Sequence, residues 1–216
     1  MKCKPEVFRK QDYKNDRVYN SKKMKTKHLD IGCGINPRNP FSRDMLYGID
    51  IINVDNSEVD FEYIKSDVVL EKLPFEDSFF DSISCYDFLE HIPRTIQRNS
   101  KLEFSFIEFM NEVHRVLKPK GIFYALTPGY PDQAAFVDPT HVNFITSKTH
   151  KYFTLPKLRA KAYGFKGSFK LSSRVKWIKV TNELEKNSFK KFLKSIFYFF
   201  LYKHRSHLMW KFECIK

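Results

Sequence analysis

This chain of 216 residues lacks the long apolar segments that cross membranes. Its longest strictly apolar run near the C-terminal end, residues 196–202, is far shorter than the ~20 residues that a spanning helix needs. The first 27 residues are rich in charge and hold no apolar segment of the kind found in secretory signals. A multi-pass membrane protein is excluded, and we expect a cytoplasmic location, with peripheral membrane contact as an open alternative.

Cysteine is also scarce, and none of the four cysteines belongs to a CxxC pair; they are Cys3, Cys33, Cys85 and Cys214. A disulfide framework or a cysteine-based zinc site is therefore not expected. A reducing compartment fits this cysteine usage. The sequence predicts no metal site.

Apolar residues make up 42% of the chain and charged residues 29%, which favours a packed core over bulk disorder. The positive charge is concentrated at the two ends. Residues 1–27 carry 10 Lys and Arg against 3 acids, residues 28–150 carry 11 against 19, and residues 151–216 carry 17 against 3. Basic ends suit nucleic acid, an anionic membrane surface or an acidic substrate. A general lysine richness on solvated faces explains them equally well.

Short segments rich in strand-forming residues alternate with helical patterns along the chain. Between the fourth and fifth of these segments, residues 100–117 place apolar side chains at helical spacing, and a Pro and a Gly then end the helix. Strands separated by helices predict parallel units in a doubly wound sheet. The expected strands are 28–31, 45–51, 61–65, 79–85 and 121–127, followed later by 168–180 and 208–215.

The strongest local signal is LDIGCGINPR, where the first strand runs into a glycine turn. Gly32 and Gly34 let backbone N–H groups approach a ligand closely. Pro37 stands where a dinucleotide fingerprint has its third glycine, which disfavours a pyrophosphate ligand. Asp50 ends the second strand, where a carboxylate can accept both hydroxyls of a ribose. Asp67 follows the third strand, where a carboxylate can accept a hydrogen bond from an adenine amino group.

Several motifs together resemble those of class I S-adenosylmethionine-dependent methyltransferases over residues 27–129: DIGCG, YGID, SDVV, LPFEDSFFDSISCYDFLEHI and EVHRVLKPKGIFYALTPG. A later segment, AAFVDPTHVNFIT, and the closing LMWKFECIK are similar to small bacterial methyltransferases, many of which modify sugars and the cell envelope. The resemblance implies an α/β, Rossmann-like, doubly wound fold. Its mostly parallel, seven-stranded sheet would have helices on both faces and an antiparallel last strand.

The resemblance also implies S-adenosyl-L-methionine as the cofactor and assigns residues to it. The methionine end would contact Asp30, Gly32, Cys33 and Gly34, the ribose Asp50, and the adenine Asp67 and Val68, while Cys85, Tyr86 and Asp87 would close the pocket. The missing third glycine changes the expected shape of the turn more than the expected cofactor.

Methyl transfer to a hydroxyl requires a base, because the oxygen loses its proton as it attacks. Candidate bases lie beyond strand ends, where ligands of open parallel sheets bind. His91 follows the fourth strand, and His141 follows the fifth, three residues after Asp138. Imidazole titrates near neutrality and suits this task, and Asp138 would orient His141 or bind a sugar hydroxyl. The alternatives are structural: His91 holds a backbone group, and Asp138 is an ordinary turn residue.

We expect residues 1–26 to form a basic tail and residues 27–216 a single methyltransferase domain. Within it, residues 130–166 would cover the acceptor and residues 186–204 would form an aromatic, basic helix. The expected reaction is O-methylation of a small molecule or a sugar-containing cell-envelope precursor. The rivals are methylation of RNA through the basic C-terminal region, a non-catalytic cofactor-binding module and a peripheral membrane module. CYDF after the fourth strand, in place of an NPPY-like tetrad, argues against transfer to an exocyclic base nitrogen.

Overall fold

The computed structural model describes residues 24–54, 60–98, 100–179 and 205–216. Among them, one segment is α-helical, α1 (Ser105–Val116), and four short turns are 3-10 helical: η2 (Leu89–His91), η3 (Gln133–Ala135), η4 (Thr149–Tyr152) and η5 (Arg159–Tyr163). The strands are β1 (Lys27–Ile31), β2 (Met45–Asp50), β3 (Glu62–Lys65), β4 (Phe80–Tyr86), β5 (Ile96–Arg98), β6 (Lys101–Glu103), β7 (Leu117–Pro128), β8 (Phe169–Leu171), β9 (Lys176–Ile178) and β10 (His207–Cys214).

The main sheet has the order β3-β2-β1-β4-β7-β10-β8, and β9 also pairs with β10. The first five strands in this order run parallel, while β10 is antiparallel to its neighbours. The predicted Rossmann-like, mostly parallel sheet with an antiparallel last strand is confirmed. It has eight strands instead of seven, because the polar residues between Leu171 and Lys176 split the expected strand 168–180 into β8 and β9.

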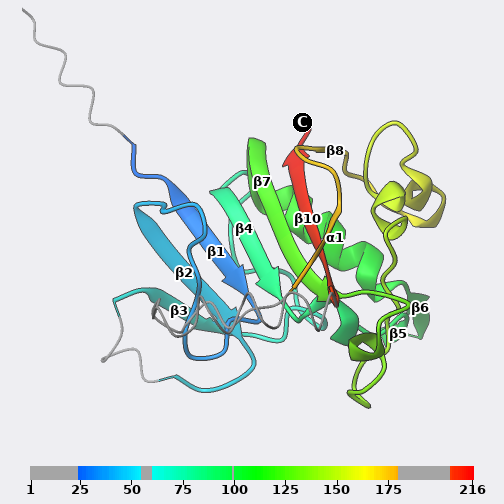
Figure 1. Ribbon diagram of the computed structural model, residues 1–216. Coiled ribbons are helices and arrows are strands. Elements are labelled where there is room, and N and C mark those ends of the chain that lie inside the picture. The colour runs from blue at the N-terminus through cyan, green and yellow to red at the C-terminus, as the bar shows by residue number, and fades with distance from the viewer. Residues whose placement is uncertain (1–23, 55–59, 99, 180–204) are drawn as a thin grey trace, which may run out of the picture.

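The chain order reverses between β1 and β4, which creates the switch point at which open α/β sheets bind ligands. The carboxyl ends of β1, β4 and β7 lie along one edge of the sheet, the lower edge in Figure 1. The residues that directly follow β1, β2, β3 and β4 therefore lie together at this edge. The predicted strand-end residues Asp50 and Asp67 lie there.

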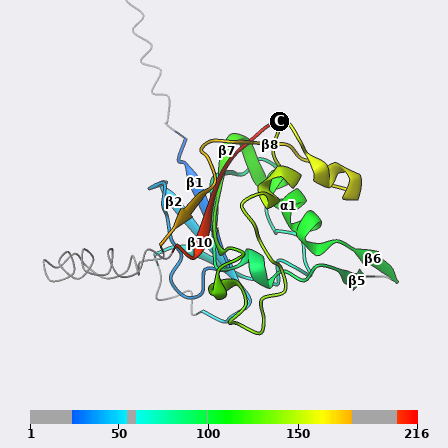
Figure 2. The same cartoon turned by 45° about the vertical axis from the view of Figure 1, so that its right-hand side comes forward.

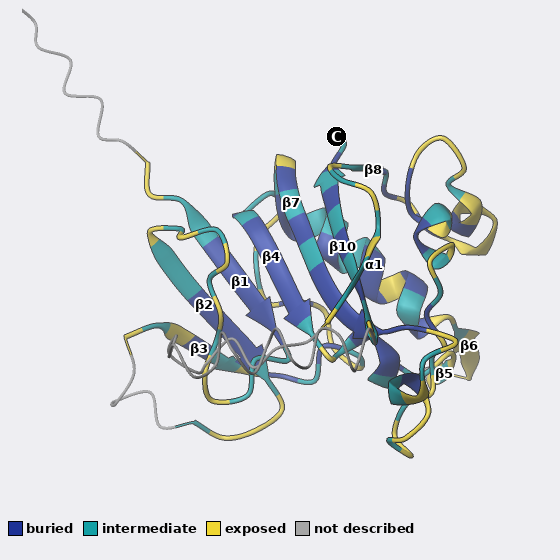
Figure 3. Cartoon of the chain, in the orientation of Figure 1, coloured by how far each residue is buried: buried dark blue, intermediate teal, exposed yellow. Residues whose placement is uncertain are grey.

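One face of the sheet packs against α1, as Figure 2 shows. The helix buries Phe109, Met110 and Val113 against apolar strand residues such as Ile83 and Phe123. The buried residues are concentrated on the central strands β1, β4, β7 and β10 (Figure 3). Burial of these side chains is the main stabilising term of the fold.

The helix is shorter than predicted at its N-terminal end. Lys101–Glu103 forms β6, which pairs with β5 in a two-stranded antiparallel hairpin. The apolar spacing that indicates the helix begins only at Phe106 and Phe109, so the pattern itself did not extend into the hairpin. The hairpin projects away from the main sheet (Figure 2).

The opposite face of β1 and β4 carries polar side chains and is covered by the loop that follows β1. Phe41 of this loop lies edge-on to Tyr124, with 6.1 Å between the ring centroids. The resemblance implied helices on both faces, but this connection contains Pro37 and Pro40, which disfavour a helix. Over the described residues, α1 is the one α-helix that covers the sheet.

Two predictions fall largely outside the described residues: the basic tail 1–26, of which only residues 24–26 are described, and the aromatic helix 186–204. Within the part of the chain that the structure describes, no helix combines the length and the apolar character that crossing a bilayer requires.

Candidate cofactor and acceptor site

A cavity of about 510 Å³ opens at the carboxyl edge of the sheet. Its walls come from the glycine turn after β1, from the ends of β2 and β3, and from the residues after β4; they include Gly32, Asp50, Asp67, Asp87 and His91. Both its size and its place at the switch point are those of a small-molecule site in an open α/β sheet.

The glycine turn needs Gly32 for two reasons. Its φ of +66° lies in the left-handed region, where other residues are strained. In addition, a Cβ at this position would lie 2.5 Å from Cδ2 of Phe88. Gly34 also has a positive φ, +57°, but a Cβ there would meet no atom within 4 Å. The turn therefore brings bare backbone to the cavity, and the ring of Phe88 packs on it.

Two carboxylates stand at strand ends in the cavity wall, and the backbone holds both. Asp50 accepts hydrogen bonds from the N–H of Gly34 at 2.8 Å and of Ile51 at 2.7 Å. Asp67 accepts from the N–H of Val69 at 3.0 Å through Oδ1. A carboxylate has about four lone-pair sites, so each keeps acceptor capacity for a ligand.

Val68, beside Asp67, is buried and lines the same cavity. It offers the apolar surface on which an aromatic base packs. Two acceptors with spare lone pairs, a glycine turn without side chains and an apolar wall fit a nucleoside cofactor without a pyrophosphate, as the resemblance implies.

Asp30 does not line the cavity but belongs to a buried polar layer beneath the glycine turn. Oγ of Ser84 donates to its Oδ1 at 2.5 Å, and the backbone N–H of Arg38 donates to its Oδ2 at 2.7 Å. Burial raises the pKa of Asp30 to about 6. The ring nitrogens of His28 lie 2.8 and 2.9 Å from the hydroxyls of Ser82 and Ser84, and burial lowers the pKa of His28 to about 4. This layer attaches the turn to the sheet.

The structure also places Cys33, Gly34, Cys85 and Tyr86 outside the cavity wall. Cys33 faces β2, where a Cβ at Gly48 would lie 2.8 Å from its sulfur. Cys85 is fully buried in the core, and the guanidinium of Arg38 covers the ring of Tyr86 at 4.1 Å. Burial raises the pKa of both thiols, that of Cys33 to about 12, so neither is a nucleophile.

Asp87, the next residue, does line the cavity and has a positive φ of +48°. Its Oδ1 lies 2.8 Å from Nε2 of His207, the first residue of β10. Antiparallel pairing of β10 with β7 brings His207 back to the cavity edge, although it is far from Asp87 in the sequence.

On the acceptor side, the loop after β7 is attached to η2. The backbone carbonyl of Glu90 accepts hydrogen bonds from the N–H of Val142 at 2.8 Å and of Asn143 at 3.0 Å. The side-chain amide of Asn143 donates to the carbonyl of Ile92. These bonds hold the predicted acceptor-side segment against the residues that follow β4.

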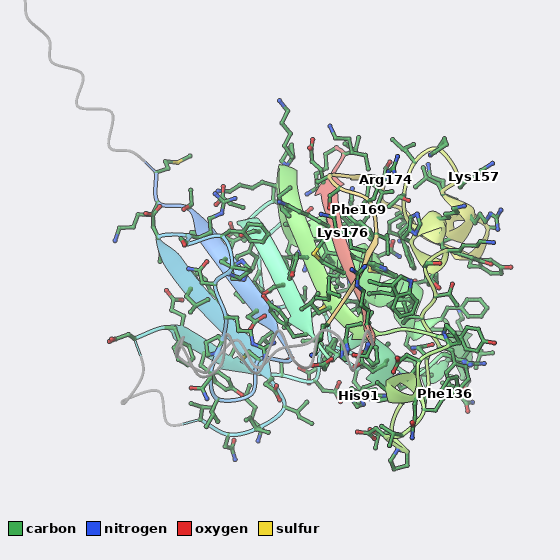
Figure 4. The ribbon with its side chains drawn as sticks, in the orientation of Figure 1. His91, Phe136, Lys157, Phe169, Arg174 and Lys176 are labelled. Atoms are coloured by element: carbon green, nitrogen blue, oxygen red, sulfur yellow. The ribbon has the colours of Figure 1, made fainter. Side chains whose placement is uncertain are left out.

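As a result, the three residues predicted as catalytic lie together. The rings of His91 and His141 are in edge contact, with centroids 4.7 Å apart. Nδ1 of His91 lies 2.9 Å from Oγ1 of Thr140, which donates to Oδ1 of Asp138 at 2.6 Å. Nε2 of His141 lies 3.9 Å from Oδ2 of Asp138. Figure 4 shows His91 at the lower edge of the sheet, where the parallel strands end.

Sequence reasoning missed Glu90, whose side chain is only 1% exposed. Its Oε2 accepts a hydrogen bond from Oγ1 of Thr127 at 3.0 Å, and its Oε1 lies 3.9 Å from Nε2 of His141. Burial raises the pKa of Glu90 to about 7. A signal was present, because an acid directly before a histidine after a strand end is visible in LEH, but nothing local shows that the carboxyl faces the site.

Comparisons with known proteins bear on this geometry. Residues 29–125 match a family described as methyltransferase domain. Similar solved structures include an S-adenosylmethionine-dependent methyltransferase from Archaeoglobus fulgidus (TM-score 0.51, 16% identity, 88% of this chain and 86% of that one). Another is from Mesorhizobium loti (TM-score 0.53, 13% identity, 88% and 91%). No curated protein matches this chain.

A third similar structure is phosphoethanolamine N-methyltransferase 1 of Haemonchus contortus, solved with phosphoethanolamine and S-adenosylhomocysteine. Its TM-score is 0.50 and its identity 12%, with 88% of this chain and 39% of that chain covered. At these identities the solved structures show the fold, which is that of class I methyltransferases. With the family match over residues 29–125, the chain is an S-adenosylmethionine-dependent methyltransferase, as the sequence predicted, and its cofactor is S-adenosyl-L-methionine.

Proposed function

We propose that this methyltransferase transfers the methyl group to a hydroxyl oxygen of a small molecule or a sugar-containing cell-envelope precursor. The observation that supports transfer to oxygen is an imidazole pair: His91 lines the cavity, and His141 lies behind it in edge contact with its ring. A hydroxyl must lose its proton as it attacks, whereas a carboxylate acceptor needs no base. This cluster takes up that proton, with Asp138 orienting the histidines through Thr140 and directly.

The cofactor supplies a methyl group that is already electrophilic on its sulfonium, so the protein acts chiefly by positioning. In our proposal Asp50 accepts the ribose hydroxyls and Asp67 the adenine amino group, with Val68 against the ring. Gly32 leaves room at the methionine end, and Asp87 closes the cavity. The remaining assigned residues support the turn from behind: Asp30, Cys33, Gly34, Cys85 and Tyr86.

The segment beside the imidazole pair exposes aromatic side chains that suit an acceptor with an apolar part. Phe136 packs against Tyr130 and Phe144, with centroids 6.1 and 5.0 Å apart, and all three rings are exposed. The guanidinium of Arg94 lies 5.2 Å from the Phe144 ring centroid. Figure 4 places Phe136 on the same edge of the sheet as His91. We therefore propose glycan-type acceptors, lipid-linked ones among them. We also propose that the enzyme is cytoplasmic.

A screen with labelled methyl donor tests this proposal. Purified enzyme is incubated with fractions of a cell extract, and labelled products are identified by mass spectrometry. We expect an ether whose label survives mild alkaline hydrolysis. A base-labile methyl ester or a label on nitrogen would contradict transfer to a hydroxyl oxygen, and bound cofactor that is never consumed would favour a non-catalytic module.

RNA is the second candidate acceptor, because residues 151–216 carry 17 basic against 3 acidic residues. Among the described residues, Lys157 and Arg174 lie toward the upper edge of the sheet in Figure 4, away from His91. This arrangement favours the small acceptor. Labelling of RNA, with an affinity that falls steeply as salt rises, would favour the rival.

A further inference from the structure

Two buried ligand-type atoms on the acceptor side lack hydrogen-bond partners within the described part of the chain. They are Oε1 of Glu90 and Nδ1 of His141. Buried polar groups in native proteins are almost always paired, because an unpaired one loses its hydration without compensation. Of these two atoms, Oε1 of Glu90 faces the imidazole of His141, 3.9 Å from its Nε2. It therefore needs a partner that the described residues do not supply.

Three ligand-type side chains converge at this place. Glu90, His91 and His141 each offer one ligand atom, and these atoms lie within 4.8 Å of one another. Ligands that share one cation at ~2.0–2.2 Å are separated by ~3–3.5 Å, and Nε2 of His141 is already 3.9 Å from Oε1 of Glu90. Small side-chain rotations therefore complete the set. The backbone bonds from Val142 and Asn143 to the Glu90 carbonyl keep the two segments together.

The hydrogen bonds around His91 determine which of its two ring nitrogens can bind a cation. The hydroxyl proton of Thr140 goes to the carboxylate of Asp138 at 2.6 Å, so Oγ1 of Thr140 is the acceptor for Nδ1–H of His91 at 2.9 Å. In the neutral ring the lone pair then stays on Nε2. Metal-binding histidines commonly donate their second nitrogen in this way to a carboxylate-linked partner.

We propose that Glu90, His91 and His141 bind one divalent transition-metal cation. Two imidazoles with one carboxylate favour zinc, iron, cobalt or manganese over calcium and magnesium, which take oxygen ligands. Three protein ligands leave coordination positions open for a substrate. The cysteine-based reasoning from the sequence could not detect this set, because its ligands come from two segments that meet only in the fold.

The role of the ion rests on the proposed transfer to oxygen. His91 lines the cofactor cavity, so open positions on the ion face the place where the acceptor enters. A cation lowers the pKa of a hydroxyl that it ligates. With both imidazoles engaged as ligands of the ion, the proton of the acceptor passes to solvent instead of to a histidine. The oxygen forms the new C–O bond, and the S–C bond of the sulfonium breaks to give a thioether. A cation with several open positions suits an acceptor with two neighbouring hydroxyls, such as a sugar diol.

Cobalt binding tests the site without any acceptor. Untagged full-length protein is stripped with a chelator and titrated with Co²⁺, whose visible absorption reports nitrogen and oxygen ligands. We expect one ion per chain. Glu90→Gln should weaken the affinity by at least ~100-fold, since loss of an outer partner alone costs 10–100-fold. Thr140→Val should weaken it by ~10-fold through the orientation of His91.

The matched control is His150→Gln. His150 is also buried and also has an unpaired Nδ1, but it is not part of the three-ligand cluster. Its replacement should leave Co²⁺ affinity unchanged. Circular dichroism and cofactor affinity show whether each variant is folded. Absence of stoichiometric binding, or equal binding by folded Glu90→Gln and His150→Gln, would overturn the site.

Measurements of methyl transfer by the stripped and the metal-loaded enzyme then distinguish a failure of the metal site from a failure of the proposed function. If the stripped enzyme still makes the methyl ether at full rate and Co²⁺ does not bind, the metal proposal fails and transfer to oxygen stands. If Co²⁺ binds as expected but the product is labelled on nitrogen, the site stands and transfer to oxygen fails. Loss of ether formation on stripping, restored by Co²⁺, Zn²⁺ or Mn²⁺ but less by Mg²⁺, supports both.

Discussion

The two halves of the site differ in how far the protein satisfies its own polar groups. On the cofactor half, Asp50 already accepts the N–H of Gly34, and Asp67 that of Val69. On the acceptor half, Glu90 and His141 each bury an atom with no partner among the described residues. A half that is internally bonded keeps its shape without a ligand. In our proposal a bound cation completes the acceptor half, so substitutions in the two halves should affect different kinetic constants.

The largest effect is expected on the acceptor half, from His141→Ala. If the imidazole handles the acceptor proton or holds the ion that does so, turnover should fall by ~10²-fold or more. The affinity for S-adenosylhomocysteine, measured by calorimetry, should not change, because His141 is not in the cavity wall. Near-normal turnover would reduce His141 to a structural role.

On the cofactor half, Gly32→Ala and Gly34→Ala form a matched pair. Both positions have a positive φ, but only at position 32 would the new Cβ meet Phe88, at 2.5 Å. We expect Gly34→Ala to cost about 1 kcal/mol in free energy of unfolding from backbone strain and Gly32→Ala about 2 kcal/mol or more. Urea unfolding measures both. Equal costs would mean that the ring of Phe88 moves freely and does not pack on the turn.

Asp50→Ala should weaken S-adenosylhomocysteine binding by ~10-fold or more, because a charged hydrogen-bond acceptor for the ribose is lost. The turnover number at saturating cofactor should change little, the reverse of His141→Ala. Asp132→Ala is the control, since this carboxylate caps η3 and is absent from the cavity wall. Unchanged calorimetric affinity in Asp50→Ala would contradict the assignment of the cavity to the cofactor.

How much was visible in the sequence also differs between the two halves. The cofactor half depends on local patterns: a glycine turn directly after a strand, and acids such as Asp50 and Asp67 at strand ends. The contact between Asp87 and His207 joins residues 120 positions apart, and the approach of His141 to Glu90 depends on how a loop is bonded. Such pairings are set by tertiary packing, which no local pattern reports.

Two predictions about helices were wrong: a helix after the first strand, and the start of the helix at residue 100. In both cases the sequence contained local information against them. Pro37 and Pro40 could have excluded a helix after the first strand. The three-residue strands β5 and β6 are too short to show an alternation, and the predicted helix was extended back to residue 100 although its apolar spacing begins only at Phe106. Where the resemblance and the local chemistry disagreed, as in the proline-rich connection, the local chemistry was correct.

The smallest expected effect concerns the polar layer beneath the cofactor half. The pKa of His28 is lowered from 6.5 to about 4, so the unfolded chain binds more protons in this range and stability rises with pH. The pKa of Asp30 is raised from 3.8 to about 6, so the folded chain binds more protons there and stability falls as pH rises. In the wild type the two slopes oppose each other.

Single variants should separate these slopes. Relative to the wild type, His28→Gln should lose about 1 kcal/mol in free energy of unfolding as pH rises from ~5 to ~6.5, while Asp30→Asn should gain a similar amount. Urea unfolding at several pH values measures both, and each variant is compared with itself, so a constant cost of the substitution cancels. If both variants kept the pH dependence of the wild type, the two pKa values would be unshifted and the layer would be hydrated. The polar groups of the cofactor half would then be satisfied by water, and not by the protein itself. The two halves would no longer differ in this respect.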